Sequence, residues 1–249
     1  MKVKYNLSWK DEWDDLRIEL WCLRKGEDWA KAEGRSLAYH FKEACKLCWP
    51  HIDWHRWVEL GNNEIRRPNA KVTVFMGPGS TGKTAIAGFE YLLEYYASPQ
   101  DTLILISSTD MRGLELRIFG EIKMLHELAV TRHPWLPGHL IDSKHCIATD
   151  DLAEDEISER IKSRDLRKGV IGIPTVQGGK NVGLGKWQGI KQKHLRLIAD
   201  DCTAMSSTFL SAFANLNNNI DFQACICFNP DDIKKSFFYR WRGTAFRLQ

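Results

Sequence analysis

Residues 77–84 read Gly-Pro-Gly-Ser-Thr-Gly-Lys-Thr and complete the G-x-x-x-x-G-K-S/T pattern of a phosphate-binding loop. Residues 71–76 before it are β-branched and apolar and predict a buried strand, whereas residues 85–93 after it predict a helix. In that setting backbone N–H groups and the helix N-terminus bind phosphate oxygens. The predicted nucleotide-binding residues are Gly77, Pro78, Gly79, Ser80, Thr81, Gly82, Lys83 and Thr84.

Two side chains of this loop have specific predicted roles. Lys83 is expected to reach the β- and γ-phosphates of a nucleoside triphosphate. Thr84 is expected to hold Mg²⁺ through its hydroxyl. The sequence has no Asn-Lys-x-Asp segment of the kind that reads guanine, which favours ATP over GTP as the nucleotide.

The composition restricts the class of protein to which the chain can belong. Its 249 residues are 43% hydrophobic and 27% charged, which suits one full core with a small appendage. No stretch approaches 18 uninterrupted apolar residues, and the N-terminus lacks the apolar core of a signal peptide. Seven scattered cysteines fit reduced thiols, so we expect a cytoplasmic protein. A net charge of +3 is too small to indicate nucleic-acid binding by itself.

A helical segment is predicted ahead of the loop. Residues 8–25 and 36–48 each place apolar side chains at helical spacing, and Pro50 ends the second helix. We therefore divide the chain into an N-terminal helical extension, residues 1–60, and a phosphate-loop domain, residues 61–249.

The second predicted helix ends in a pattern that resembles a zinc motif. Cys45 and Cys48 are followed by His51 and His55, but only two residues separate the two pairs instead of about a dozen. Both cysteines also fall on the apolar face of the helix, which favours core thiols. The aromatic turn that follows is expected to pack on the domain or to stack on adenine; it contains Trp49, Trp54 and Trp57.

An apolar strand that ends in two acids is the second predicted part of the site. Residues 195–199 are followed by Asp200 and Asp201, and another buried strand, residues 102–109, lies between the loop and this strand in the sequence. In phosphate-loop ATPases the first acid holds Mg²⁺ and the second activates the attacking water. A helix over residues 111–130 carries basic residues that are solvated or contact nucleic acid; they are Arg112, Arg117 and Lys123.

Three further segments have open interpretations. A strand over residues 222–228 precedes Asn229, which senses the γ-phosphate or begins an Asn-Pro turn. The glycine-rich residues 178–189 are either a disordered connection or a loop that approaches a phosphate backbone or a neighbouring subunit. Residues 150–168, acidic and then basic, form a surface helix or a partner-facing loop.

Taken together, these parts resemble the ATPase domain of a tailed-bacteriophage terminase large subunit, the DNA-packaging motor, over roughly residues 40–235. The resemblance implies an α/β fold, a P-loop NTPase of the additional-strand (ASCE, RecA-like) type, with a mostly parallel central sheet flanked by helices. It also implies ATP and Mg²⁺ as cofactors, with Lys83 on the phosphates and Thr84 and Asp200 on Mg²⁺. Asp201 then activates water, and Asn229 links hydrolysis to movement.

The sequence departs from the family pattern at three places. Many members have Glu where Asp201 stands, and an Arg often stands at the position of Gln188, where it acts as an arginine finger on a neighbour's ATP. No glutamine before the loop is available to read adenine. The basic residues that could replace the finger are Lys186, Lys191, Arg164 and Arg167.

The resemblance also implies partners and a place of action. These are double-stranded DNA gripped by its backbone, a homo-oligomeric ring, and the portal and small terminase subunit. The place is the cytoplasm of the infected host cell, at the procapsid portal. The nuclease domain of full-length members is expected to be absent from this chain. Two alternatives are another DNA-directed ATPase, of the helicase or recombinase kind, and an assembly module with incidental hydrolysis.

Overall fold

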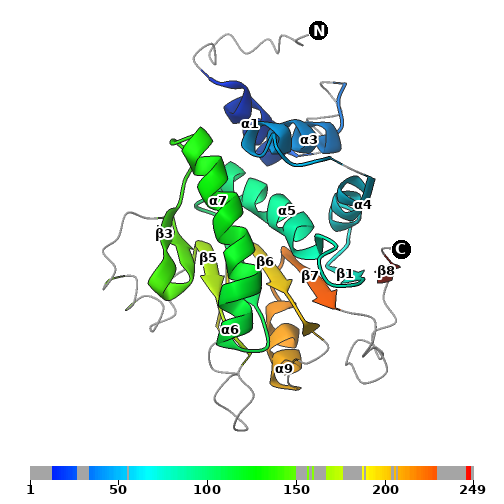
Figure 1. Cartoon of the computed structure of the whole chain (residues 1–249), viewed down its shortest axis with the longest axis vertical. Helices are drawn as coiled ribbons and strands as arrows, with labels where there is room; N and C mark the ends of the chain where they lie inside the picture. The colour runs from blue at the N-terminus through cyan, green and yellow to red at the C-terminus, as the bar shows by residue number, and fades with distance from the viewer. Residues whose placement is uncertain are drawn as a thin grey trace.

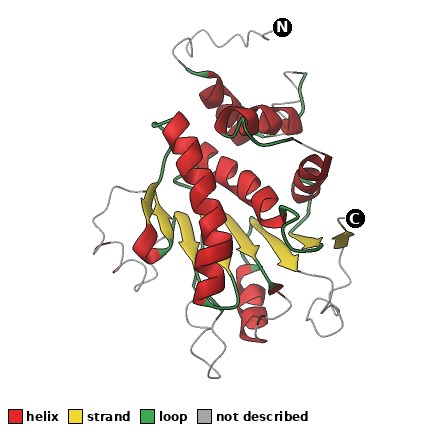
Figure 2. Ribbon diagram, in the orientation of Figure 1, coloured by secondary structure: helices red, strands yellow, loops and turns green. Residues whose placement is uncertain are grey.

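The fold is seen in a computed structural model, which describes residues 13–26, 34–54, 56–149, 156, 159, 167–175, 187, 189–202, 205, 207–228 and 245–247. The strands are β1 (Val72–Met76), β2 (Thr102–Ser107), β3 (His139–Ile141), β4 (Cys146–Ala148), β5 (Gly169–Gly172), β6 (His194–Ala199), β7 (Phe222–Phe228) and β8 (Ala245–Arg247). The helices are α1 (Asp15–Lys25), α3 (Leu37–Cys48), α4 (Arg56–Ile65), α5 (Lys83–Ala97), α6 (Met111–Gly113), α7 (Gly120–Arg132) and α9 (Ser207–Leu216), with a π-helix η2 (Leu114–Phe119) and a 3₁₀ turn η3 (Asp142–Lys144). Figures 1 and 2 show their arrangement.

The strands form a single eight-stranded sheet in the order β3-β4-β5-β2-β6-β7-β1-β8. The pairs from β5 to β8 are parallel, and only β3 and β4 join antiparallel. Strand β7 lies between β1, which precedes the phosphate loop, and β6, which precedes the acids. This extra strand confirms the predicted additional-strand, mostly parallel fold. The strand between the loop and the acids in sequence, β2, lies on the far side of β6.

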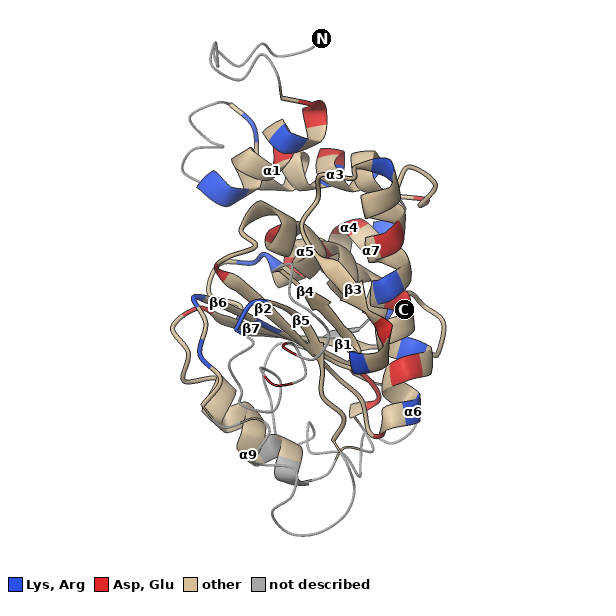
Figure 3. Cartoon of the chain, turned by 90° about the vertical axis from the view of Figure 1, so that its left-hand side faces the viewer, with Lys and Arg blue, Asp and Glu red and all other residues tan. Residues whose placement is uncertain are grey.

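Alternate residues of the central strands supply two hydrophobic cores, one on each face of the sheet. Ile104 and Ile106 of β2 face the core that α5, α7 and the N-terminal helices complete. Leu103 and Leu105 face the core that α9 completes. Figure 3 shows the sheet between these layers, with charged residues along α1 and α7 and none on α9. Because both faces are covered, the strands are continuous apolar runs, which explains why the sequence predicted them well.

The N-terminal helices agree in part with the prediction. Helix α3 begins after Ser36, whose hydroxyl accepts the N–H of Tyr39 at 3.2 Å. The prediction that the first helix begins at residue 8 was wrong, because Trp13 and Asp14 are not helical and Asp14 caps α1 by accepting the N–H of Arg17. The predicted aromatic turn also continues into a helix, α4, which was not predicted.

Between α7 and β5 the chain forms a small antiparallel addition that was not predicted. Strands β3 and β4 have three residues each, too short for an alternating pattern to be recognised. The predicted helix over residues 111–130 is present, but it contains the π-helix η2. Such wide turns are frequent at functional sites. Within the described residues, no helix is long and apolar enough to cross a membrane.

Candidate active site

The predicted phosphate loop connects the end of β1 to the start of α5. Its last glycine, Gly82, is the N-cap of α5 with φ of 75°, a left-handed conformation that glycine adopts without strain. Gly82 provides no side-chain cap, so N–H groups of the first helical turn remain available to an anion. The N–H of Gly77 donates to the carbonyl oxygen of Phe228, which joins the loop to the end of β7 at 3.3 Å.

Lys83 lies across this loop. Its side chain is nearly buried, and its ammonium group donates to the carbonyl oxygens of Gly77 at 2.8 Å and Pro78 at 2.6 Å. It also lies 3.3 Å from the hydroxyl of Thr81. The ammonium group of Lys83 is therefore hydrogen-bonded within the loop itself. A bound phosphate must compete with these carbonyl groups for the ammonium.

The two acids follow directly after β6, at the edge of the sheet where the loop lies. The N–H of Asp200 donates to the carbonyl oxygen of Ser107 at 2.9 Å, which continues the β2–β6 pairing past the strand end. Burial raises the pKa of Asp200, while the N–H of Asp201 and the charges of Arg117 and Lys83 act in the opposite direction. Asp201 has φ of 55°, a left-handed conformation that Asp tolerates better than most residues.

A cleft of about 500 Å³ joins these parts. It is lined by Gly79, Ser80, Thr81, Gly82, Lys83, Thr84, Ala85, Leu116, Arg117, Glu121, Asp200, Asp201 and Phe228. The structure thus brings Lys83 and Thr84 to the same cleft as Asp200 and Asp201, although more than 110 residues separate the two pairs. Gly77 and Pro78 contribute carbonyl groups to Lys83 and do not line the cleft. Asn229 lies outside the described residues.

Two charged residues of the cleft were not predicted as part of it. Arg117, expected to be solvated or to contact nucleic acid, pairs with Asp201 at 3.0 Å. Glu121, one turn further along, faces the same cleft, and burial raises its pKa. The sequence did contain an indication that these two residues lie near the site. A helix that follows β2 starts at the carboxyl edge of a parallel sheet, where ligands bind.

Of the four basic residues expected to replace the arginine finger, Arg167 and Lys191 are among the described residues. The carbonyl oxygen of Arg167 accepts from Gln192, just before β6, so Arg167 and Lys191, the residue before Gln192, are near the amino ends of the strands. The cleft with the phosphate loop and the two acids lies at the carboxyl ends of the strands, the opposite edge of the sheet. Arg164, Lys186 and Gln188 lie outside the described residues.

The two cysteines of the zinc-like pattern lie in the core, whereas His51 is exposed and His55 is outside the described residues. Cys45 and Cys48 are 3% and 1% exposed, and burial raises the pKa of both thiols. No disulfide joins the seven cysteines, all of which are among the described residues and buried. Trp49 is buried as well and donates its indole N–H to the carbonyl oxygen of Leu125 at 2.8 Å. No tryptophan is among the described residues that line the cleft, so this segment packs on the domain.

Comparisons with known proteins agree with the geometry. No protein-family model and no curated protein sequence matches the chain. The large-terminase ATPase domain of Thermus phage P74-26 is similar in structure, with a TM-score of 0.53 and 17% identity over 82% of this chain and 76% of that domain. An arginine-to-alanine variant of that domain is similar with a TM-score of 0.53 and 16% identity. The match covers 83% of this chain and 76% of the variant domain.

The HK97 bacteriophage large terminase is also similar, with a TM-score of 0.51 and 11% identity. The match covers 76% of this chain and 36% of the HK97 protein. At these identities the likeness shows the fold. The predicted resemblance to large-terminase ATPase domains is confirmed at that level, and the roles of individual residues remain predictions.

Proposed function

We propose that this protein is a Mg²⁺-dependent ATPase whose hydrolysis of ATP drives double-stranded viral DNA into a procapsid. The observation that carries the proposal is the single cleft lined by Lys83 and Thr84 on one side and by Asp200 and Asp201 on the other. The fold shared with phage large-terminase ATPase domains supports a packaging motor as the setting of this chemistry.

In this proposal the loop N–H groups and Lys83 bind the triphosphate. The oxygen of a water molecule forms a bond to the γ-phosphorus, and the bond from that phosphorus to the β,γ-bridging oxygen breaks, so that its electron pair leaves with ADP. The carboxylate of Asp201 accepts the proton of the attacking water. Lys83 has to leave the carbonyl oxygens of Gly77 and Pro78 before it can contact the phosphates.

Thr84 and Asp200 are the residues that would hold the metal. Their hydroxyl and carboxylate oxygens are the hard ligands that Mg²⁺ prefers, and both line the cleft. When bound, Mg²⁺ would neutralise charge that develops on the phosphate oxygens. A cation beside Asp200 would also compensate for the burial that raises its pKa.

The coupling of hydrolysis to movement is proposed to run through Asn229, the residue after β7. The hydrogen bond from Gly77 to Phe228 supports this assignment, because it joins the phosphate loop to the residue just before Asn229. We propose that the working form is a ring that grips the DNA backbone, with a portal and a small terminase subunit as partners. Its place of action would be the host cytoplasm, at the procapsid portal.

The test is steady-state ATP hydrolysis with and without double-stranded DNA, in Mg²⁺ and in EDTA. We expect slow turnover that requires Mg²⁺, and we expect Lys83→Ala and Asp200→Asn to abolish it while the far-UV circular dichroism is unchanged. Asp142→Asn, at an exposed acid outside the cleft, is the matched control and should retain turnover. Appreciable turnover in either cleft variant would contradict the proposal.

The DNA dependence separates the packaging function from the alternatives. A packaging motor should respond to double-stranded DNA without sequence preference and with a steep salt dependence. Turnover stimulated by single strands together with strand separation would instead indicate a helicase. Oligomers that form equally well with Lys83→Ala and show no turnover would indicate an assembly module.

A further inference from the structure

Arg117 stands out among the cleft residues because it contacts the acid that is proposed to activate water. It belongs to the π-helix η2, and its side chain is 50% exposed. Its Nη1 donates to Oδ2 of Asp201 at 3.0 Å, across 84 residues of sequence. Both residues line the cleft.

A competing ligand can readily replace one partner of the ion pair between Arg117 and Asp201. Because half of the Arg117 side chain and a quarter of Asp201 are exposed, water screens the attraction, and such pairs contribute little to stability. A phosphate group carries more charge than a carboxylate and can accept two parallel hydrogen bonds from a guanidinium. A triphosphate in the cleft would therefore compete for Arg117.

The local structure leaves room for this arginine. A Cβ on Gly113 would lie 2.8 Å from Nη2 of Arg117 and 2.8 Å from Oγ of Ser108, so only glycine allows the side chain to lie there. The Oγ of Ser108 is buried and has no hydrogen-bond partner among the described residues. Buried polar groups without a partner are uncommon in native proteins and call for an explanation, such as a catalytic role or a bound water or ion.

We propose that Arg117 is a phosphate-binding residue that acts in its own subunit and exchanges partners when ATP binds. Without a triphosphate its guanidinium holds Asp201; with one, it binds the γ-phosphate and releases the Asp201 carboxylate to accept the proton of water. The inference rests on the proposed function of the cleft. It assigns to Arg117 a role that does not depend on a residue from a neighbouring subunit.

The test compares the binding of Mg²⁺-ADP and of Mg²⁺-AMP-PNP, which is not hydrolysed, by calorimetry on the whole chain. Because only the γ-phosphate is proposed to contact Arg117, Arg117→Gln should weaken AMP-PNP binding about tenfold and leave ADP binding within about twofold. Arg112→Gln, at an exposed arginine of the same helix outside the cleft, is the matched control and should change neither. Equal loss for both nucleotides, or an equal effect of Arg112→Gln, would overturn the proposal.

A double-mutant cycle tests the exchange itself. Asp201→Asn removes the competing partner and should tighten AMP-PNP binding by up to about fivefold. In the Arg117→Gln background the same substitution should have no such effect, because the guanidinium is absent. An equal gain in both backgrounds would show that Asp201 merely repels the phosphate, and the proposal would be wrong.

The same binding measurements distinguish a failure of the proposed function from a failure of the role of Arg117. If wild type and Lys83→Ala bind both nucleotides equally well, or if neither binds, the cleft is not a nucleotide site, and the assignment of Arg117 falls with it. If Lys83→Ala loses both nucleotides while Arg117→Gln retains both, the nucleotide site stands and only the role of Arg117 is refuted. A thermal melt of each variant shows whether it folds.

Discussion

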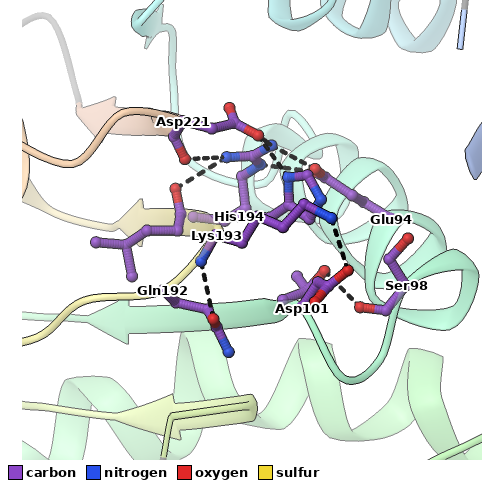
Figure 4. Close-up of polar contacts among 10 residues, drawn as sticks. Glu94, Ser98, Asp101, Gln192, Lys193, His194 and Asp221 are labelled. Carbon is purple, nitrogen blue, oxygen red and sulfur yellow. Dashed lines mark hydrogen bonds and ion pairs between the residues drawn. The ribbon is translucent and has the colours of Figure 1, made fainter.

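The guanidinium of Arg196, in the middle of β6, donates to both carboxylate oxygens of Glu94 on α5. Its remaining N–H groups donate to the carbonyl oxygens of Leu195 and Asp221 and to the Asp221 carboxylate, so all five donors are used. Figure 4 shows Glu94, His194 and Asp221 pointing toward one another at the amino ends of the strands. The network joins α5, the helix of the phosphate loop, to β6, the strand of the acids.

Removal of Glu94 is expected to destabilise the fold. Arg196 is 3% exposed, and Glu94→Ala leaves its charge with only Asp221 as counter-ion, at a cost of about 2 kcal/mol or more in the free energy of unfolding. Arg196→Met in the same background should recover part of the loss, because it removes the buried charge. Glu43→Ala, which breaks an exposed pair with Lys46, should cost less than about 1 kcal/mol. Urea denaturation measures all four proteins, and a double variant less stable than Glu94→Ala would refute the explanation.

A second prediction concerns stability in mild acid. His126 is buried, accepts from the Tyr96 hydroxyl at 2.9 Å and donates to the Gly138 carbonyl oxygen at 3.2 Å, an arrangement of the neutral imidazole. Burial lowers its pKa to about 4, below the unfolded value of about 6.5. The unfolded state therefore binds the proton first, so the contribution is complete above pH 6.5 and is lost as the pH falls toward 4, by about 3 kcal/mol.

The measurement is the free energy of unfolding from pH 7.5 to pH 4. His126→Gln retains a donor and an acceptor but has no titrating ring, so its stability should depend less on pH across this range. His139→Gln, at an exposed histidine, is the control and should follow the wild type. Parallel curves for His126→Gln and wild type would contradict the prediction.

A third prediction concerns the junction of β4 and β5. Gly169 has φ of 104°, and a Cβ there would lie 2.2 Å from the backbone oxygen of Ile147, which cannot move without breaking the strand pairing. Gly169→Ala should therefore cost about 3 kcal/mol or more. Gly189 also has positive φ, at 76°, but nothing lies within 4 Å of the added carbon, so Gly189→Ala should cost about 1 kcal/mol. Similar losses in chemical denaturation would show that the backbone conformation alone matters.

A fourth prediction links Gly113 to the cleft. Gly113→Ala suits a helical backbone, but its methyl group would displace Arg117 and crowd Ser108. We expect weaker AMP-PNP binding with unchanged ADP binding, as for Arg117→Gln. The double variant Gly113→Ala, Arg117→Gln should bind AMP-PNP no more weakly than Arg117→Gln alone. An additional loss in the double variant would show that the methyl group acts elsewhere.

The sequence by itself determined the local parts of the site. The phosphate loop, the strands on either side of β6, and the helix over residues 36–48 depend on neighbouring residues and on periodicity, so the sequence alone predicts them. The pair Asp200 and Asp201 was predicted for the same reason, since an apolar strand that ends in two acids is a local pattern.

Only the tertiary structure decided which parts meet. The placement of β7 between β1 and β6, the ion pair between Arg117 and Asp201, and the network around Arg196 join residues far apart in the chain. No periodicity or spacing encodes such neighbours, because strand order depends on how whole elements bury their apolar faces together. Arg117 looked like a solvated helix residue in the sequence, and only the packing of η2 against β2, the strand next to β6, brings it to the cleft.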